Sequence, residues 1–277
     1  MIDRAYCKVN LALDVFNKRE DGYHDLRSIM VACDFFDEIE ILKSEKSEYI
    51  DVKNKLQFNS HNTLVKAVDL MKESFDIKDN FKIIIDKHIP IKAGLAGGTA
   101  DGAAVIRTLN KMYNLNLSFE QIRELCLKIG SDVLFNYYNK PALVEGTGDK
   151  IEFIDIKDDY YVLIVKPKRG VSTRKCYEIL DVNNCEHPDI DLIKERLKKG
   201  EEVKELLKNS LEKSAAVLCK DINKAINDLK LAGADFTMVS GSGSSVFTID
   251  LDKNRIEDIR KKLLNKGYFV RSTKILK

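Results

Sequence analysis

The segment with the clearest chemical meaning is glycine-rich and runs from residue 90 to residue 101, as Pro-Ile-Lys-Ala-Gly-Leu-Ala-Gly-Gly-Thr-Ala-Asp. It stands between a strand-like run and a helix-like run. Glycine lets the backbone approach a ligand closely, and the first amides of a helix are unpaired and lie at the positive end of its dipole. The segment therefore predicts a phosphate-binding turn. Its spacing matches neither the Walker pattern nor G-x-G-x-x-G, and a flexible turn before a helix explains the glycines equally well.

Three further features could carry chemistry, and each has a structural alternative. Residues 240–245, Ser-Gly-Ser-Gly-Ser-Ser, join two strand-like runs and are too long for a two-residue hairpin turn. Asp132 follows Gly130 and Ser131 at the start of an apolar segment, where a plain helix N-cap is the alternative to a catalytic carboxylate. Lys8 lies on the first strand, where a solvent-facing lysine is the alternative.

The elements that must position these residues begin with a strand. From residue 5 to residue 15 every odd position is apolar or small, whereas Lys8, Asn10 and Asp14 take even positions, which predicts a strand with one buried face. Further strands are expected at 26–31, 37–42 and 81–85. Asn62 opens a helix, and Ser118 with Gln121 forms the capping box of another.

The turn-rich residues 145–149 mark the expected domain boundary. Beyond it the order changes to a strand at 160–165, a helix at 173–180, a helical stretch that ends near 230, strands at 236–239 and 246–249, a helix at 254–265 and a strand at 268–275. Apart from the inserted helices, this is a split β-α-β-β-α-β order, which is the ferredoxin-like arrangement.

Composition excludes several classes of partner. The 277 residues carry a formal charge of +2, which gives no reason to expect nucleic acid or an anionic membrane. The six cysteines show neither zinc-like nor disulfide-framework spacing. No apolar run is long enough for a membrane span, and the first residues do not form a signal peptide. We expect a cytoplasmic protein with a small-molecule substrate and no obligate protein partner.

Several separated motifs, taken together, resemble the GHMP kinases along nearly the whole chain. They are A-Y-C-K-V-N-L-A-L at 5–13, D-G-Y-H-D-L at 21–26, the glycine-rich segment at 90–104, G-S-D-V at 130–133, V-S-T at 171–173 with Tyr177, and the segment 240–247. The resemblance implies an α+β fold in two domains. Residues 1–150 would form an α/β domain similar to the second domain of ribosomal protein S5, and residues 151–277 a ferredoxin-like domain, with the active site between them.

The resemblance also implies the activity and the roles of residues. The D-G-Y-H loop points to the family members that use ATP, with Mg²⁺, to phosphorylate a hydroxyl of 4-diphosphocytidyl-2-C-methyl-D-erythritol in the non-mevalonate route to isoprenoids. Asp132 would accept the hydroxyl proton and Lys8 would stabilise the transferring phosphoryl group. No metal ligands are evident. ATP would be held by the glycine-rich segment, at Pro90, Ala93, Gly94, Leu95, Ala96, Gly97, Gly98, Thr99 and Ala100. The acceptor would be held by Asn10, Tyr23, His24, Tyr177, Gly241, Ser242 and Gly243.

Two residues depart from the family pattern. Ala96 replaces a glycine and puts a Cβ where the backbone could need a positive φ, and Ala100 replaces a serine. We expect a serine at position 100 to tighten ATP binding or leave it unchanged. Two alternatives stay open at this point: a GHMP kinase with another acceptor, and a non-catalytic GHMP-fold sensor of a nucleotide or metabolite.

Overall fold

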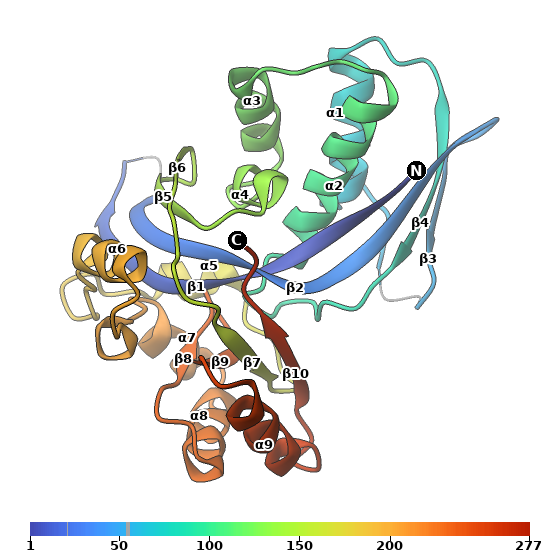
Figure 1. Ribbon diagram of the computed structural model, residues 1–277. Helices are drawn as coiled ribbons and strands as arrows, with labels where there is room; N and C mark the ends of the chain where they lie inside the picture. The colour runs from blue at the N-terminus through green and yellow to red at the C-terminus, as the bar shows by residue number, and fades with distance from the viewer. Residues whose placement is uncertain (21, 54–55) are drawn as a thin grey trace. The chain divides into compact units, whose positions relative to one another are not determined.

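The computed structural model describes residues 1–20, 22–53 and 56–277, and this part of the chain forms two compact units (Figure 1). The first unit consists of Met1–Cys7, Phe35–Pro90 and Ala96–Asn139. The second unit consists of Lys8–Asp34, Ile91–Leu95 and Lys140–Lys277. Each unit is therefore discontinuous in sequence. The division into domains at residue 150 stays a prediction.

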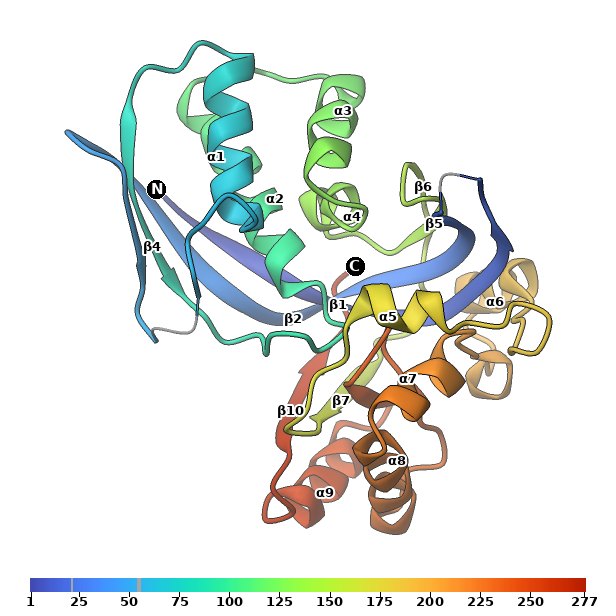
Figure 2. The same cartoon turned by 180° about the vertical axis from the view of Figure 1, so that it is seen from behind.

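The first unit combines a sheet with helices. The later part of β2 (His24–Ser44) pairs antiparallel with β4 (Asn80–Asp86), and β4 pairs parallel with β3 (Glu48–Asp51). The helices are α1 (Thr63–Ser74), α2 (Gly97–Met112), α3 (Phe119–Ile129) and α4 (Val133–Tyr138). Figures 1 and 2 show α1 and α2 side by side, in agreement with their many contacts.

The predicted helix starts in this unit are confirmed, but one strand prediction is wrong. The side chain of Asn62 accepts a hydrogen bond from the Leu64 amide, and Ser118 and Gln121 form the capping box. The two strands expected at 26–31 and 37–42 are a single strand, β2. The residues between them contain neither glycine nor proline, and Ala32 and Cys33 are fully buried, so nothing interrupts the extended chain.

The second unit contains the beginning of β2, which pairs antiparallel with β5 (Ala142–Gly146), and β5 pairs with β6 (Lys150–Phe153). Part of β1 (Ile2–Lys18) also belongs to it. A second, antiparallel sheet has the strand order β10-β7-β9-β8. Its strands are β7 (Tyr161–Lys166), β8 (Met238–Val239), β9 (Val246–Asp250) and β10 (Phe269–Lys274).

The remaining elements of the second unit are helical. They are α5 (Thr173–Glu178), α6 (Ile190–Lys199), the short 3-10 helix η1 (Lys204–Leu206), α7 (Glu212–Leu218), α8 (Asp221–Ala232) and α9 (Lys253–Leu263). The helices that contact this sheet are α8 and α9. With β7, α8, β8, β9, α9 and β10 in this order and a 4-1-3-2 sheet, the expected ferredoxin-like arrangement is confirmed. The helices α5 to α7 are inserted between β7 and α8.

The helices α8 and α9 lie next to this sheet (Figure 2), and a cluster of buried apolar side chains fills the space between them. Each large apolar side chain of this cluster contributes about 1.5–3 kcal/mol to folding stability when it is buried away from water. The cluster includes Leu163, Val165, Val239 and Val246 from the strands and Ile222, Leu229, Ile256, Ile259 and Leu263 from the helices.

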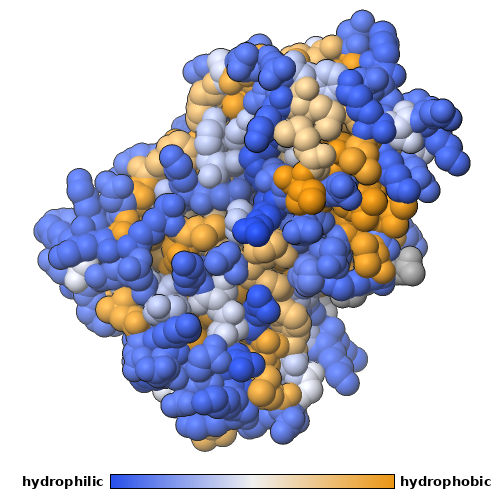
Figure 3. Space-filling view, turned by 45° about the vertical axis from the view of Figure 1, so that its right-hand side comes forward, coloured by the Kyte–Doolittle hydropathy of each residue, from blue (hydrophilic) through white to orange (hydrophobic). Residues whose placement is uncertain are grey.

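The face of the protein drawn in Figure 3 is hydrophilic over most of its area, with apolar side chains in separate patches. Within the described ranges, none of the helices has the length and apolar character that a bilayer crossing requires.

The start of α2 has an unusual backbone. Ala96 is the N-cap residue of this helix and adopts a left-handed conformation, with φ 56° and ψ 23°. The prediction that Ala96 carries its Cβ at a positive φ is therefore confirmed. The left-handed region costs a residue with a Cβ about 1–2 kcal/mol.

We therefore expect the variant Ala96→Gly to match or exceed the natural protein in stability, by up to about 1 kcal/mol, because glycine removes the strain but loses more chain entropy on folding. Urea unfolding measures the difference. Ala103→Gly is the control, since Ala103 lies inside the same helix and fully buried, and the change there should cost about 1 kcal/mol or more. Equal losses in the two variants would contradict a strained position 96.

Candidate functional site

The glycine-rich turn lies directly against the second glycine cluster, within the second unit. A Cβ atom built on Gly94 would lie 2.0 Å from the carbonyl oxygen of Ser240, so only glycine fits. The Ser245 amide donates to the Ala93 carbonyl at 3.0 Å, and Ser240 Oγ donates to the Gly94 carbonyl at 3.0 Å. Two segments that are about 150 residues apart in the sequence thus form one backbone surface.

Lys8 and Asn10 of β1 join this surface. The Lys8 amide donates to the Leu95 carbonyl at 3.2 Å, and Lys8 Nζ donates to Asn10 Oδ1 at 2.6 Å. A Cβ atom on Gly241 would lie 3.4 Å from both Lys8 Nζ and Asn10 Oδ1. The structure therefore brings together four of the predicted site residues, Lys8, Asn10, Gly94 and Gly241.

Lys8 and Asn10 are buried, at 4% and 1% exposure. This contradicts the expectation of a strand with a single buried face and the alternative that Lys8 faces solvent. The polar face of β1 stays in the interior because its groups are hydrogen-bonded: Asn10 Nδ2 donates to Ser28 Oγ at 2.8 Å, and Ser28 Oγ donates to the Ala12 carbonyl at 2.7 Å. Between residues 6 and 14 this face is buried at Lys8, Asn10 and Ala12 and partly exposed at its two ends, Tyr6 and Asp14.

Asn209 fixes the second glycine cluster from the other side. Its Nδ2 donates to the carbonyls of Val239 and Gly241, both at 2.8 Å, and it is buried. Ser242 Oγ lies 2.8 Å from Thr173 Oγ1 at the start of α5. Asn209 and Thr173 therefore hold the first half of the cluster, up to Ser242.

Neither Asn209 nor Ser28 was assigned a role from the sequence. The available signal was weak in both cases. Ser28 is the one hydroxyl side chain in the apolar run 26–31, and Asn209 stands just before the helix α7. Polar side chains in such positions indicate a buried hydrogen bond but do not identify its partner.

The predicted residues from Ala96 onward belong to the first unit, where α2 begins. The first bond of the regular helical pattern runs from the Ala100 amide to the Ala96 carbonyl at 2.9 Å, so the amides of Gly97, Gly98 and Thr99 precede it. Thr99 Oγ1 lies 2.8 Å from the Ala96 carbonyl oxygen. An anion that reaches this helix end would meet three N–H groups and the positive end of the dipole.

Pro90 and Ala100 complete the predicted nucleotide-binding segment. Pro90 is partly exposed and directly precedes the turn. Ala100 is 1% exposed, so a serine there would place its hydroxyl among buried groups. The expected effect of a serine on ATP binding stays a prediction.

Asp132 lies in the first unit at the start of α4 and is partly exposed. Its side chain makes no capping hydrogen bond to that helix, although it occupies the N-cap position. The simple N-cap interpretation therefore lacks its defining contact. Lys8 belongs to the second unit, so a joint role for the two residues stays a prediction.

The aromatic residues predicted to hold the acceptor differ in their surroundings. Tyr23 is 63% exposed and is not part of the core, whereas His24 is buried. Tyr177 on α5 is half-buried, contacts the His24 ring with a centroid separation of 5.3 Å, and also packs against the apolar cluster of the second unit. Burial, and then the charge of Lys18, lower the pKa of His24, so the ring is neutral at pH 7.

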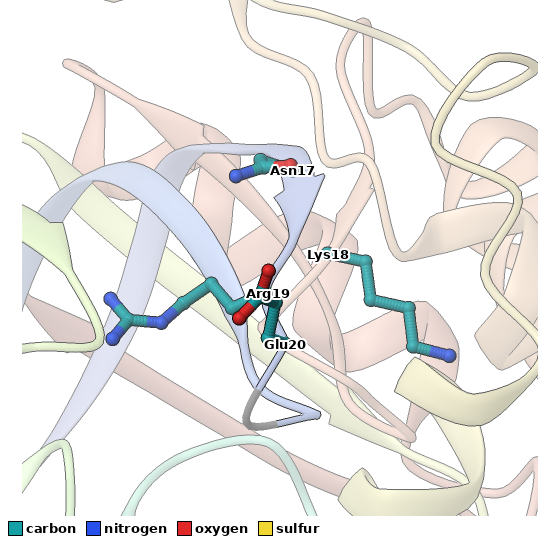
Figure 4. A pocket seen from close by; sticks show the side chains of 4 residues that line it. All are labelled: Asn17, Lys18, Arg19 and Glu20. Carbon is teal, nitrogen blue, oxygen red and sulfur yellow. The ribbon is translucent and has the colours of Figure 1, made fainter.

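The loop that carries Tyr23 follows a surface hollow at the end of β1, lined by residues 17–20 (Figure 4). The side chains of Lys18 and Arg19 project to opposite sides there. The Arg19 amide donates to the Tyr23 carbonyl at 2.8 Å, and Asn17 Nδ2 donates to Asp25 at 2.9 Å. These contacts hold the described part of the loop, and Asp21 of the D-G-Y-H motif lies outside the described residues.

Family comparisons match both halves of the chain. The model for the GHMP kinases N terminal domain matches residues 62–140, and the model for the GHMP kinases C terminal matches residues 184–268. A 4-diphosphocytidyl-2-C-methyl-D-erythritol kinase of Bacillus cytotoxicus is 36% identical over 98% of this chain and 96% of its own length. The protein of the same name from Bacillus cereus is 35% identical over the same shares.

Solved structures show the same fold. A crystal structure of 4-(cytidine 5'-diphospho)-2C-methyl-D-erythritol kinase superposes with a TM-score of 0.84 at 24% identity, and covers 99% of each chain. The mevalonate kinase of Methanococcus jannaschii gives a TM-score of 0.69 at 19% identity over 100% of this chain and 98% of its own. The chain belongs to the GHMP kinase family and is an ATP-dependent small-molecule kinase.

Proposed function

We propose that this kinase transfers the terminal phosphoryl group of ATP to a hydroxyl of 4-diphosphocytidyl-2-C-methyl-D-erythritol. The main observation in support is that Lys8 and Asn10 lie against the backbone of the turn at Gly94 and of the cluster at Gly241. The names and the full-length similarity of the Bacillus relatives support the choice of acceptor.

In this proposal the protein acts mainly by positioning and by neutralising charge, as phosphoryl transfer requires. The amides at the start of α2 hold the phosphate chain. Mg²⁺ bound with the nucleotide would be held largely by phosphates and water, and would neutralise phosphate charge. Lys8 places a buried cation beside the transferring group. Asn10, already oriented by Ser28, directs the acceptor. Asp132 accepts the hydroxyl proton.

The cytosine is proposed to bind at the Tyr23 loop. The exposed ring of Tyr23 offers a stacking face, and the neutral His24 ring rests on Tyr177. Tyr177 supports His24 and contributes the edge of its own ring. A coupled ADP-release assay with the cytidyl substrate, mevalonate and homoserine tests the acceptor, and preferred turnover of either of the last two would refute it.

Asp132→Asn and Lys8→Met should each lower kcat by about 10²–10⁴, because each removes a group that acts only as the proton and phosphoryl group move. Steady-state kinetics over a range of pH measure the effect. Asp252→Asn is the matched control, since Asp252 is an N-cap whose side chain does accept a helix amide, that of Asn254. Asparagine caps a helix about as well as aspartate, so this change should leave both kcat and stability nearly unchanged. If Asp132→Asn behaves like this control, Asp132 is not the base.

Tyr23→Ala should raise KM for the cytidyl substrate about tenfold or more, because stacking on a base is worth about 1–3 kcal/mol. KM for ATP should change little, and Tyr23→Phe should be mild because it keeps the ring. Initial-rate measurements with each substrate varied in turn separate the two constants. A parallel rise of both KM values would instead indicate a disturbed fold, and no rise in either would remove the base-binding role of Tyr23.

A further inference from the structure

A buried network of three charged side chains lies in the first unit, outside the residues assigned to the reaction. The side chains of Asp37, Lys87 and Asp101 are 0%, 2% and 4% exposed. Lys87 Nζ donates to Asp101 Oδ2 at 2.6 Å and also to Asp37 Oδ2. The three residues come from β2, from the segment that follows β4, and from α2, so one amine joins three elements.

Asp37 holds the chain that leads toward the glycine-rich turn. Its second oxygen accepts hydrogen bonds from the backbone amides of His88 and Ile89, the latter at 2.7 Å. Together with the Lys87 side chain, these bonds fix residues 87–89 on β2. This segment is followed by Pro90 and the turn itself.

Lys87 also contacts α2 at two successive turns. A Cβ atom built on Gly97 would lie 3.2 Å from Lys87 Nζ and 2.9 Å from Ile89 Cγ2, so the first helical residue rests directly on this segment. Asp101 is four residues, or about one turn, further along the same helix. Two contacts one turn apart fix both the rotation and the position of the helix start.

Net stabilisation is a poor explanation for this arrangement. Buried ion networks often contribute no more than apolar residues of similar volume, because their desolvation offsets the Coulombic attraction. In addition, Asp101 Oδ1 is buried without a hydrogen-bond partner among the described residues. Burial raises the pKa of Asp101, although attraction to Lys87 opposes this shift. Burial alone would lower the pKa of Lys87, but attraction to Asp101 and Asp37 outweighs it, so the pKa of Lys87 is raised. The network therefore costs desolvation free energy, and its clear effect is to fix the positions of residues 87–89 and of the start of α2.

We propose that Asp37, Lys87 and Asp101 are positioning residues that fix the start of α2, so that the amides of Gly97, Gly98 and Thr99 converge on the phosphate chain of ATP. The inference rests on the proposed role of this helix end in binding nucleotide. The three side chains act through the backbone and do not touch the substrate.

The test uses Asp101→Ala, which removes the anchor on α2 but leaves Lys87 paired with Asp37. A small displacement of a binding group costs about tenfold to a hundredfold, so Kd and KM for ATP should rise by that factor. KM for the cytidyl substrate should stay within about twofold of the natural value, because only the nucleotide end is displaced. Asp101→Asn keeps an acceptor for Lys87 and should restore most of the affinity.

Gly97→Ala tests the same contact from the helix side, because the added Cβ would collide with Ile89 and Lys87. It should weaken ATP binding to a similar extent, and it serves as the test if Asp101→Ala does not fold. Asp3→Ala is the control. Asp3 accepts a hydrogen bond from Arg107 of α2 at 2.9 Å. Arg107 keeps its hydrogen bonds to backbone carbonyls and lies ten residues beyond Gly97, so losing Asp3 removes one charged contact of this helix away from its start, and ATP binding should not change.

Calorimetric titration with ATP gives Kd without turnover and separates two failures. If the natural protein binds ATP but does not phosphorylate the cytidyl substrate, the proposed acceptor is wrong, and the variants still decide the positioning role. If folded Asp101→Ala or Gly97→Ala binds ATP as the natural protein does, or if Asp101→Asn is as impaired as Asp101→Ala, the positioning role is refuted.

Discussion

The close approach of Gly94 to Ser240 is the constraint on which the rest of the candidate site depends. No side chain fits between these two backbones, and Gly94 has a φ of 74°, which favours glycine. The contact aligns the turn before α2 with the cluster at 240–245. The hydrogen bond from the Lys8 amide to the Leu95 carbonyl then ties β1 to the same turn. The backbone of the turn is thus held by contacts from two other segments, β1 and the cluster at 240–245.

A second constraint is the burial of polar side chains on β1. A cation such as Lys8 is costly to bury unless its protons are hydrogen-bonded. Asn10, Ser28 and the Ala12 carbonyl form a chain of hydrogen bonds behind it, which leaves Asn10 with one defined orientation. Replacing any member would leave a buried donor or acceptor without its partner, so the chain specifies the geometry of the site as much as it supports the strand.

The periodicity of apolar residues and the types of residue at helix starts predicted much of the fold but little of the geometry of the site. The ferredoxin-like order followed from short-range periodicity, and the caps at Asn62 and Ser118 from residue type alone. Alternation along β1 identified one face but could not tell that hydrogen bonds bury the other. The roles of Asn209 and Ser28 depend on partners 16 or more residues away, and no local pattern encodes such pairs. The glycine-rich turn was predicted from its composition, and the family resemblance assigned residues 240–245 to the same active site. The direct backbone contact between Gly94 and Ser240 could be found only in the structure.

The backbone of the turn bears on whether its glycines serve flexibility or binding. Two residues with side chains, Lys92 and Ala96, adopt left-handed conformations on either side of Gly94, with φ of 52° and 56°. Each costs about 1–2 kcal/mol, and a flexible segment would relax to a cheaper conformation. Such conformations persist where surrounding contacts over-determine them, and they are concentrated at functional sites. The hydrogen bonds to the carbonyls of Ala93, Gly94 and Leu95 provide those contacts. A turn held in this way loses little conformational entropy when it meets a phosphate chain, which favours binding over flexibility as the reason for its glycines.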